Sequence, residues 1–398
     1  MCDVYLNNLG ILCALGADCQ EVSSGLFQKQ SSALTFSGAY STSPLPLGIV
    51  SANYGIEKTH LPIPDRSRNN VLLLSALHQI RSAVDHAISH FGKDRVGIVI
   101  GTSTSGMEES VSAFEYRATC SKLCFPANYH YSQQEIGSPA AALQKELGTS
   151  GPAFVHSSAC SSGAKAIISG ARMLAAGICD AVIAGAADTL NAFVVSGFSS
   201  LEAVSKIPCI PFSANRTGIS LGEGTALFLM TREPSMVRLS GWGESSDGYH
   251  ISSPAPDGRG ARLAIKNALK KAGLMASDID YINLHGTGTL QNDAMESAVV
   301  HELFGKSVYV SSTKGMIGHT LGAAGAIEAG ICWLAMHKDN PTGKLPPHIW
   351  DGIPDDSLPQ MNMVCPNTCL GRRIQHCISN SFAFGGSNAS LVFSRGDA

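Results

Sequence analysis

Three pairs of segments recur in the same order along the chain, and this repeat limits the folds that the chain can adopt. Each pair shares a short apolar run followed by a glycine-containing turn. A period this long indicates duplication of a domain rather than a solenoid of short repeats. Chance recurrence of Gly-Ser-Thr turns is the alternative interpretation. The pairs are 99–110 with 283–297, 154–164 with 309–319, and 218–230 with 381–393.

The repeat predicts two halves, residues 1–232 and residues 233–398. Within them, short β-branched runs such as 95–100 and 180–188 alternate with helical segments such as 161–177. Strands that alternate with helices are typical of an α/β protein with a buried, mixed or parallel sheet. We therefore expect helices on both faces of the sheet.

Composition excludes several classes of protein. Of the 398 residues, 44% are hydrophobic and 15% are charged, which excludes a disordered chain. The net charge of −3 argues against a nucleic-acid partner. No run of 18 apolar residues occurs, so no membrane span is expected, and the first residues lack the basic start of a signal peptide.

The twelve cysteines do not follow a metal-binding or disulfide pattern. The closest pairs, Cys120/Cys124 and Cys365/Cys369, are both C-x3-C and have no partner at zinc-finger spacing. We therefore expect no metal and no disulfide scaffold. A reducing, cytoplasmic location follows as the default expectation.

Cys160 is the candidate nucleophile. It stands between an apolar strand and the segment SSGAKAIISGA, which has helical composition. Unpaired N–H groups at a helix N-terminus stabilise a thiolate, so the position predicts a lowered pKa for the thiol. A buried structural cysteine is the alternative interpretation.

Two histidines are candidate acid–base groups. His285 begins HGTGT after a predicted strand, and His319 lies in KGMIGHTLGAAG after another. In a duplicated α/β fold the strand ends of both halves can meet at one pocket, which would place both rings beside Cys160. Each histidine read alone is more often a polar core residue with satisfied hydrogen bonds.

The motifs VHSSACSSGA, HGTGT, STKGMIGHTLGAAGAIEA and SNSFAFGGSNAS, in this order, resemble those of a β-ketoacyl-acyl carrier protein synthase. The resemblance runs nearly end to end and is to the elongating, Cys-His-His type of fatty acid and polyketide synthesis. The segments RSRNNVLLLSAL, GTSTSGMEES and NYHYSQQEIGSPA are most similar to the ketosynthases of aryl polyene pathways.

The resemblance implies a thiolase-like fold of two βαβαβαββ halves in α-β-α-β-α layers, usually dimeric. It implies that Cys160 accepts an acyl chain from acyl carrier protein. His285 and His319 then promote decarboxylation of malonyl-acyl carrier protein and attack on the Cys160 thioester. The product is a β-ketoacyl chain two carbons longer. No cofactor is implied beyond the phosphopantetheine that carries the substrates.

The resemblance also assigns supporting roles, each beside a plainer alternative. Lys314 and Glu328 would support the histidines, or be surface charges. Thr287 and Thr289 would bind the phosphopantetheine arm, or only form the turn. Phe384 would gate the site, and its backbone N–H would join that of Cys160 in an oxyanion hole, or it would be a core residue.

Some features depart from the family pattern. Ile210 stands before Pro211, where fatty acid synthases have Arg-Pro, which puts one carrier-docking position in doubt. Arg66 and Arg68 are alternative candidates for docking an acidic carrier, or belong to a solvated surface.

Two alternative functions remain open. A thiolase resembles this pattern but has a second catalytic cysteine where this chain has SFAFGG. A chain-length factor has the same fold without a nucleophile, and Cys160 argues that this chain is the active member of such a pair. Homodimer and heterodimer with a chain-length-factor-like partner are both consistent with the sequence.

Overall fold

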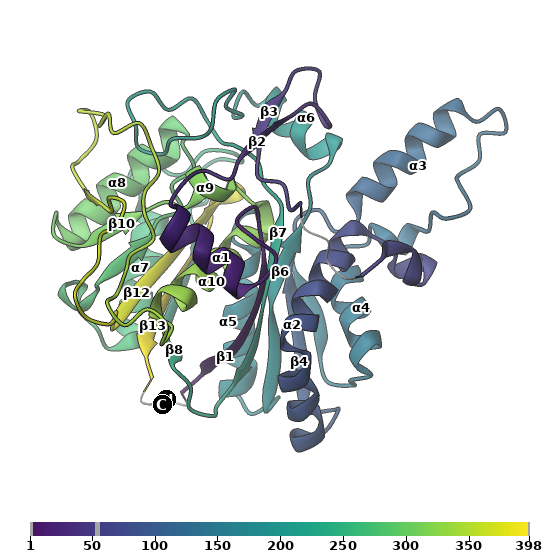
Figure 1. Cartoon of the computed structure of the whole chain (residues 1–398), viewed down its shortest axis with the longest axis horizontal. Helices are drawn as coiled ribbons and strands as arrows, with labels where there is room; N and C mark the ends of the chain where they lie inside the picture. Colours follow the sequence, from purple (N-terminus) through teal and green to yellow (C-terminus); the bar gives the residue numbers. More distant parts are fainter. Residues whose placement is uncertain (1–2, 52–55, 397–398) are drawn as a thin grey trace.

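The computed structural model describes residues 3–51 and 56–396 of the chain (Figure 1). Within these residues one mixed sheet has eleven strands, in the order β11-β10-β9-β12-β13-β8-β1-β7-β6-β4-β5. The strands are β1 (Tyr5–Leu12), β4 (Val96–Gly101), β5 (Ala153–His156), β6 (Ala181–Asp188), β7 (Gly224–Thr231), β8 (Val237–Ser246), β9 (Tyr281–Asn283), β10 (Tyr309–Ser311), β11 (Asn362–Met363), β12 (His376–Ala383) and β13 (Ser387–Arg395). A separate two-stranded sheet pairs β2 (Thr35–Ser37) with β3 (Leu45–Leu47).

The sheet repeats one topology twice. Five neighbouring strands of the N-terminal half lie in the order β1-β7-β6-β4-β5. Numbered by their position along the chain, these five are the first, fifth, fourth, second and third. The five strands β8-β13-β12-β9-β10 of the C-terminal half follow the same order. The pairing repeats too, with two antiparallel contacts followed by two parallel ones. Each pair of recurring segments falls on equivalent strands: β4 with β9, β5 with β10, and β7 with β13. The division at residues 232 and 233 stays a prediction.

Helices cover the sheet in three layers, which confirms the predicted α-β-α-β-α arrangement. Helices α2 (Arg68–Phe91) and α4 (Ser138–Leu147) pack on the N-terminal half, and α7 (Arg259–Ala272) and α8 (Leu290–Phe304) on the C-terminal half. Helices α5 (Ser162–Ala175) and α10 (Ala324–Met336) lie between the halves. Figure 1 shows the two halves on opposite sides of the molecule. Shorter helices are α1 (Cys19–Ser24), α3 (Met107–Thr119), α6 (Ala192–Ser200) and α9 (Lys314–Ile317).

Burial on both faces explains the composition of the central elements. In β6, Val182, Ala184 and Ala186 face the central helices, and Ala181, Ile183 and Ala187 face the layer of α2. Such a strand has no polar face, so its sequence is continuously apolar. Every residue of α10 is buried, which is the expected environment of a helix that is apolar all round. No helix in the described part of the chain is both long and apolar enough to cross a membrane.

Glycines let α5 and α10 approach each other closely. A Cβ on Gly163 would lie 2.7 Å from the backbone nitrogen of Ala326, and one on Gly325 would lie 2.8 Å from that of Ala164. Since α5 follows Cys160 and α10 follows His319, this contact joins the elements that carry the candidate site.

We expect Gly163→Ala to lower the free energy of unfolding by about 1–3 kcal/mol, because the added methyl overpacks the contact of α5 with α10. Gly197→Ala in α6 is the matched control, since nothing lies within 4 Å of its Cβ position. This control should stabilise the protein by about 0.5–1 kcal/mol. Urea denaturation of both variants measures the two values, and equal effects would contradict the close approach.

Candidate active site

Cys160 occupies a tight turn between β5 and α5. The preceding residue, Ala159, has φ +48, a left-handed conformation that is strained for a residue with a Cβ. Two hydrogen bonds hold the turn. The backbone N–H of Ser158 donates to Ser162 Oγ at 2.9 Å, and the Ser162 hydroxyl donates to the carbonyl oxygen of Ala159 at 2.6 Å. The turn leaves the Cys160 side chain 5% exposed, facing the C-terminal half.

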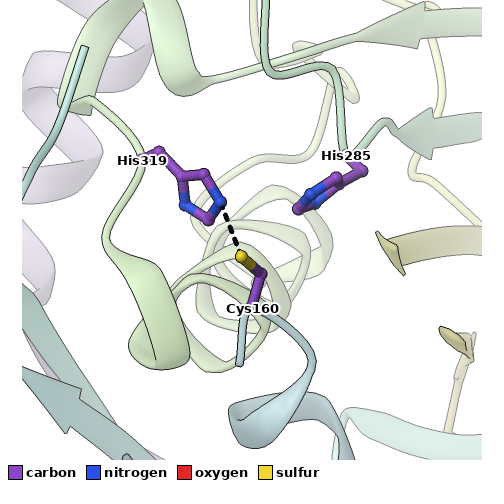
Figure 2. Close-up of side chains that lie close together, drawn as sticks. All are labelled: Cys160, His285 and His319. Atoms are coloured by element: carbon purple, nitrogen blue, oxygen red, sulfur yellow. Dashed lines mark hydrogen bonds between the residues drawn. The ribbon is translucent and has the colours of Figure 1, made fainter. Parts of the chain in front are cut away.

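The structure brings both predicted histidines to Cys160 (Figure 2). His285 follows β9, and His319 follows α9. The sulfur and one ring nitrogen of each histidine all lie within 4.8 Å of one another. His319 Nε2 is 3.0 Å from Cys160 Sγ, and the two rings meet edge to face with centroids 5.3 Å apart. Strand ends of the two halves therefore converge, as the sequence predicted.

The hydrogen bonds at Nδ1 fix the tautomer of both rings. The backbone N–H of Leu321 donates to His319 Nδ1 at 3.2 Å. The Lys314 ammonium, which can only donate, lies 3.5 Å from His285 Nδ1. Each neutral ring therefore carries its proton on Nε2. The N–H group of His319 points at the sulfur of Cys160.

Burial keeps both imidazoles neutral. It lowers the pKa of His285 and of His319 well below the ordinary value, and the positive charge of Lys314 lowers both further. Neutral imidazoles can donate a hydrogen bond from Nε2 to an oxygen on which negative charge develops.

Burial also raises the pKa of the Cys160 thiol to about 11, against the lowering effects of Lys314 and the backbone N–H of Phe384. The prediction of a lowered pKa from the helix position was therefore wrong, because loss of water around the sulfur outweighs the nearby donors. The resting site holds a thiol whose proton must leave during acylation.

The Cys160, His285 and His319 set has the residue types of a metal site, but its hydrogen bonds do not suit one. A ligating histidine needs a lone pair on the nitrogen that faces the metal, and its other N–H usually donates to an acceptor. Here Nδ1 of each ring accepts from a donor, so the inward nitrogen carries a proton. The donor set favours oxyanion binding over metal binding.

Lys314 and Glu328 form a buried ion pair, and each side chain is 1% exposed. The alternative of two surface charges is therefore wrong. The ammonium of Lys314 also donates to the carbonyl oxygen of His285. Burial raises the pKa of Glu328 to about 7, opposed by the charge of Lys314. The pair places a cation directly behind the His285 ring.

Sequence reasoning missed Glu296. Its carboxylate accepts from the backbone N–H groups of His285 at 2.8 Å and Gly286 at 2.7 Å, and burial raises its pKa to about 7. It thereby holds the start of the HGTGT turn. The available signal was a pair of acids, Asp293 and Glu296, three residues apart at the start of the helix after that turn.

Two cavities meet at Cys160, and Phe384 lines both of them. The first, about 350 Å³, is the more polar of the two, and its mixed lining includes Thr287, Thr289 and Asn388 beside apolar side chains such as Phe382. The hydroxyls of the two threonines are 2.9 Å apart. The second, about 430 Å³, is lined mainly by apolar side chains such as Phe193 and Leu201, which are 64% and 55% exposed.

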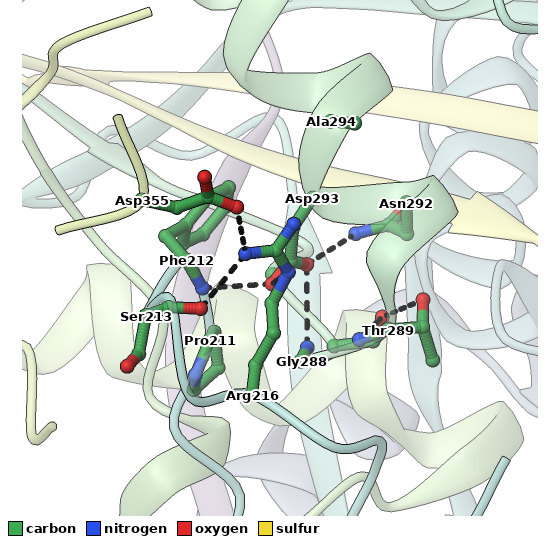
Figure 3. Close-up of polar contacts among 12 residues, drawn as sticks. Pro211, Phe212, Ser213, Arg216, Gly288, Thr289, Asn292, Asp293, Ala294 and Asp355 are labelled. Atoms are coloured by element: carbon green, nitrogen blue, oxygen red, sulfur yellow. Dashed lines mark hydrogen bonds and ion pairs between the residues drawn. The ribbon is translucent and has the colours of Figure 1, made fainter. Parts of the chain in front are cut away.

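A charged network braces the wall of the polar cavity (Figure 3). Arg216 Nη1 donates to Asp355 at 2.6 Å and to the carbonyl of Ser213 at 2.8 Å, and its Nε lies 3.7 Å from Asp293. Asp293 also accepts from the backbone N–H of Phe212 at 2.7 Å. The network joins the 210–217 segment to α8 and to the loop at Asp355.

The two arginines predicted as candidates for carrier docking are engaged within the chain. Arg68 forms an ion pair with Glu223, whose side chain is 1% exposed. Arg66 donates to the carbonyl oxygens of Thr59 and Leu61. Both side chains fasten the start of α2 and the loop before it.

Comparison with known proteins decides the family. The models for "Beta-ketoacyl synthase, N-terminal domain" and "Beta-ketoacyl synthase, C-terminal domain" match residues 68–235 and 236–349. The chain belongs to the β-ketoacyl synthase family. It is therefore an enzyme of the acyltransferase type.

Individual relatives cover most of the chain. Nodulation protein E of Rhizobium meliloti is 31% identical over 98% of this chain and 98% of its own length. The 3-oxoacyl-[acyl-carrier-protein] synthase 2 of Staphylococcus aureus (strain COL) is 32% identical over 87% of this chain and 86% of its own length. Among solved structures, a ketosynthase (ApeO) in complex with its chain length factor (ApeC) from Xenorhabdus doucetiae is 43% identical, with a TM-score of 0.91 over 99% and 98% of the two chains. These matches confirm the thiolase-like fold and the resemblance to aryl polyene ketosynthases.

We expect the rate at which iodoacetamide alkylates Cys160 to rise about tenfold per pH unit between about pH 7 and pH 10. Thiolate is the reactive form, and a thiol with a raised pKa remains mostly protonated over this range. Peptide mass spectrometry of quenched time points gives the rate for Cys160 itself. A plateau near neutral pH would instead indicate a thiolate already present at rest.

Proposed function

We propose that this β-ketoacyl synthase extends an acyl chain held on Cys160 by two carbons taken from malonyl-acyl carrier protein. The observation that carries the proposal is the convergence of one thiol and two Nε2–H groups where a polar and an apolar cavity meet. The polar cavity fits a phosphopantetheine arm, and the apolar cavity fits the acyl chain. The named activity of the Staphylococcus aureus relative supports the same reaction.

In the loading step, the sulfur of Cys160 attacks the thioester carbonyl of an acyl carrier protein. The new C–S bond forms first and gives a tetrahedral oxyanion. The old C–S bond then breaks, and the proton of the Cys160 thiol passes to the departing phosphopantetheine sulfur. The backbone N–H of Phe384 points at this sulfur. Together with the N–H of Cys160 it would stabilise the oxyanion.

In the condensation step, the malonyl thioester loses carbon dioxide and becomes an enolate. The Nε2–H groups of His285 and His319 donate to the thioester oxygen on which that negative charge develops. The enolate carbon attacks the acyl carbonyl on Cys160. The C–S bond to Cys160 breaks, and the β-ketoacyl product leaves on its carrier.

The remaining predicted residues support these steps. Lys314, held by Glu328, keeps the His285 ring neutral and orients its N–H. Thr287 and Thr289 lie along the polar cavity, where their hydroxyls can bind the phosphopantetheine arm. Phe384 packs against Phe198 with ring centroids 5.6 Å apart and stands between the cavities, as a gate would.

The proposed reaction needs no further cofactor, because loss of carbon dioxide drives it and phosphopantetheine carries both substrates. It does need a free Cys160 thiol, and a reducing, cytoplasmic location would preserve it. The thiolase alternative is not favoured, because Cys377 lies within β12 with its sulfur against Met336, away from the triad. A structural role alone is not favoured either, since the catalytic set is complete.

We propose acyl carrier protein and a homologous chain as partners, in polyene synthesis of the aryl polyene kind. The ketosynthase ApeO, at 43% identity, is paired with its chain length factor. The apolar cavity of this chain is lined by the exposed Phe193 and Leu201, and α3 beside it exposes Phe114. A second chain seated there, identical or homologous, would close the acyl cavity.

We expect wild-type protein to gain one acyl group from a short acyl carrier protein, and Cys160→Ala to gain none, because Cys160 is the acceptor. Intact mass spectrometry measures the adduct. Cys124→Ala, which removes an exposed thiol on the surface, is the control and should be acylated like the wild type.

Two other outcomes have distinct meanings. An adduct that forms only after co-expression with a homologous chain would favour an obligate heterodimer. No adduct under either condition would contradict the condensing function and favour a structural partner.

We expect His319→Ala to slow discharge of the acyl-enzyme by malonyl carrier protein about 10²–10⁴-fold, because the enolate loses a hydrogen-bond donor. The Cys160 adduct should still form. Rapid-quench mass spectrometry follows the decay of the adduct. His348→Ala is the control, since this buried ring bonds Ser312 and Pro211 outside the triad. Discharge at the wild-type rate in His319→Ala would remove this ring from the mechanism.

A further inference from the structure

Asp188, the last residue of β6, is a fully buried carboxylate that the proposed mechanism does not use. Its Oδ1 binds the turn after β4, accepting from the Thr102 hydroxyl at 2.6 Å, the Ser103 N–H at 3.0 Å and the Thr104 N–H at 3.1 Å. Its Oδ2 accepts from the Ser103 hydroxyl at 2.5 Å and also reaches the other half of the chain, where the Gly322 N–H donates to it at 2.6 Å. One side chain therefore joins two segments that are far apart in the sequence.

Gly322 belongs to the turn that follows His319. Its neighbour Leu321 has φ +54, which a residue with a Cβ adopts only when surrounding contacts hold it. A Cβ on Gly322 would lie 2.6 Å from Asp188 Oδ2 and 2.8 Å from the Ser103 nitrogen, so the turn fits closely against the carboxylate. The bond from Gly322 to Asp188 is thus a contact that can hold Leu321 in its strained conformation.

The same turn sets the tautomer of His319. The backbone N–H of Leu321 donates to His319 Nδ1, which leaves the ring proton on Nε2, facing Cys160. If the turn moved, Nδ1 would lose this donor and could itself take a proton. We propose that Asp188 is a positioning residue that, by binding Gly322, holds the Leu321 N–H on His319 and so keeps the His319 Nε2–H aimed at the reacting atoms.

The hydrogen bonds of Asp188 also affect the apolar cavity. Ser103 and Thr104, which Asp188 holds on one side, line the apolar cavity, and so does Leu321 on the other side. The wall that contacts the acyl chain and the turn that orients His319 therefore share one carboxylate. The inference rests on the proposed function and adds a residue to its condensation step.

Asp188→Asn tests the contact with Gly322. The amide oxygen in the place of Oδ1 can keep the Thr102, Ser103 and Thr104 donors, and the Ser103 hydroxyl, which binds Oδ2, can rotate to accept from the new NH2 group. That NH2 group faces the Gly322 N–H, donor against donor. We expect discharge of the acyl-enzyme by malonyl carrier protein to slow about ten- to hundredfold, as for other residues that orient a functional histidine.

The pH profile of discharge separates positioning from general damage. In Asp188→Asn, Nδ1 of His319 is free to accept a proton, so discharge should gain an additional loss of rate at acid pH, below the ordinary range of histidine titration because burial and Lys314 still lower the pKa of the ring. An acid loss shared by Asp188→Asn and Gly322→Ala reports His319, because Asp188→Asn also removes a charge that raises the pKa of Cys160, whereas Gly322→Ala keeps that charge. The other titratable groups around the ring keep their identity in every variant. These groups are Cys160, His285, Lys314 and Glu328.

Thr102→Val is the matched control. It removes a hydrogen bond to the same carboxylate but leaves the Gly322 contact in place. It should lower the melting temperature as Asp188→Asn does, yet keep the wild-type pH profile. If both variants lost the same fraction of the discharge rate at every pH, Asp188 would have only a structural role, and the proposal would be overturned.

Gly322→Ala covers the case in which Asp188→Asn does not fold, because it displaces the turn with the carboxylate intact. It should show the same additional acid loss, and a wild-type profile would overturn the proposal. A wild-type enzyme that is never acylated or discharged would contradict the proposed function instead. The pH dependence of Cys160 alkylation in Gly322→Ala, which keeps the Asp188 charge, then still reports the His319 ring, and a wild-type dependence in that variant would overturn the positioning role.

Discussion

A buried ammonium group governs the chemistry of this site. Lys314 is held against Glu328 and the carbonyl of His285, and its charge acts on both imidazoles. Burying a cation costs free energy unless it is paired and hydrogen-bonded, and here Glu328 and the carbonyl meet that requirement. Because the cation donates to Nδ1 of His285, the ring proton has only Nε2 to occupy. Lys314 therefore fixes the inward Nε2–H of His285 and adds to the burial that keeps both rings neutral, whereas the Leu321 N–H fixes the tautomer of His319.

The ion pair alone does not bring Cys160 and the two histidines together, and the fold does this. Cys160 comes from the N-terminal half, and both histidines come from the C-terminal half. The two halves meet through α5 and α10, whose glycines allow their backbones to approach. Helix α5 begins directly after Cys160, and α10 carries Glu328 shortly after His319. A close helix contact therefore lies behind the Cys160, His285 and His319 cluster, where tight packing limits movement.

The sequence predicted the duplication and the cluster of Cys160, His285 and His319, because both leave local signals. Glycine turns after apolar runs identify strand ends. Cys160 and His285 follow β5 and β9 within a few residues, whereas His319 follows the short helix α9. It could not predict which partners their atoms have. Glu296, and Asp188 in its contact with Gly322, accept from backbone N–H groups. Every residue except proline supplies such a donor, so the residue type at the other end of the bond does not indicate the contact. The pKa of Cys160 was mispredicted for a related reason: helix position is local, whereas burial depends on both halves.

The direction of each hydrogen bond, rather than residue identity, decides what a Cys-His-His cluster can do. If carboxylates or carbonyls stood behind the two rings, Nδ1 would carry the proton and Nε2 would offer a lone pair suited to a metal. Here an ammonium and a backbone N–H stand there, so both rings present N–H groups. The same three residues therefore form a site for developing negative charge. Since one of those donors is Leu321, the electrostatic character of the site depends on a backbone turn as much as on its side chains.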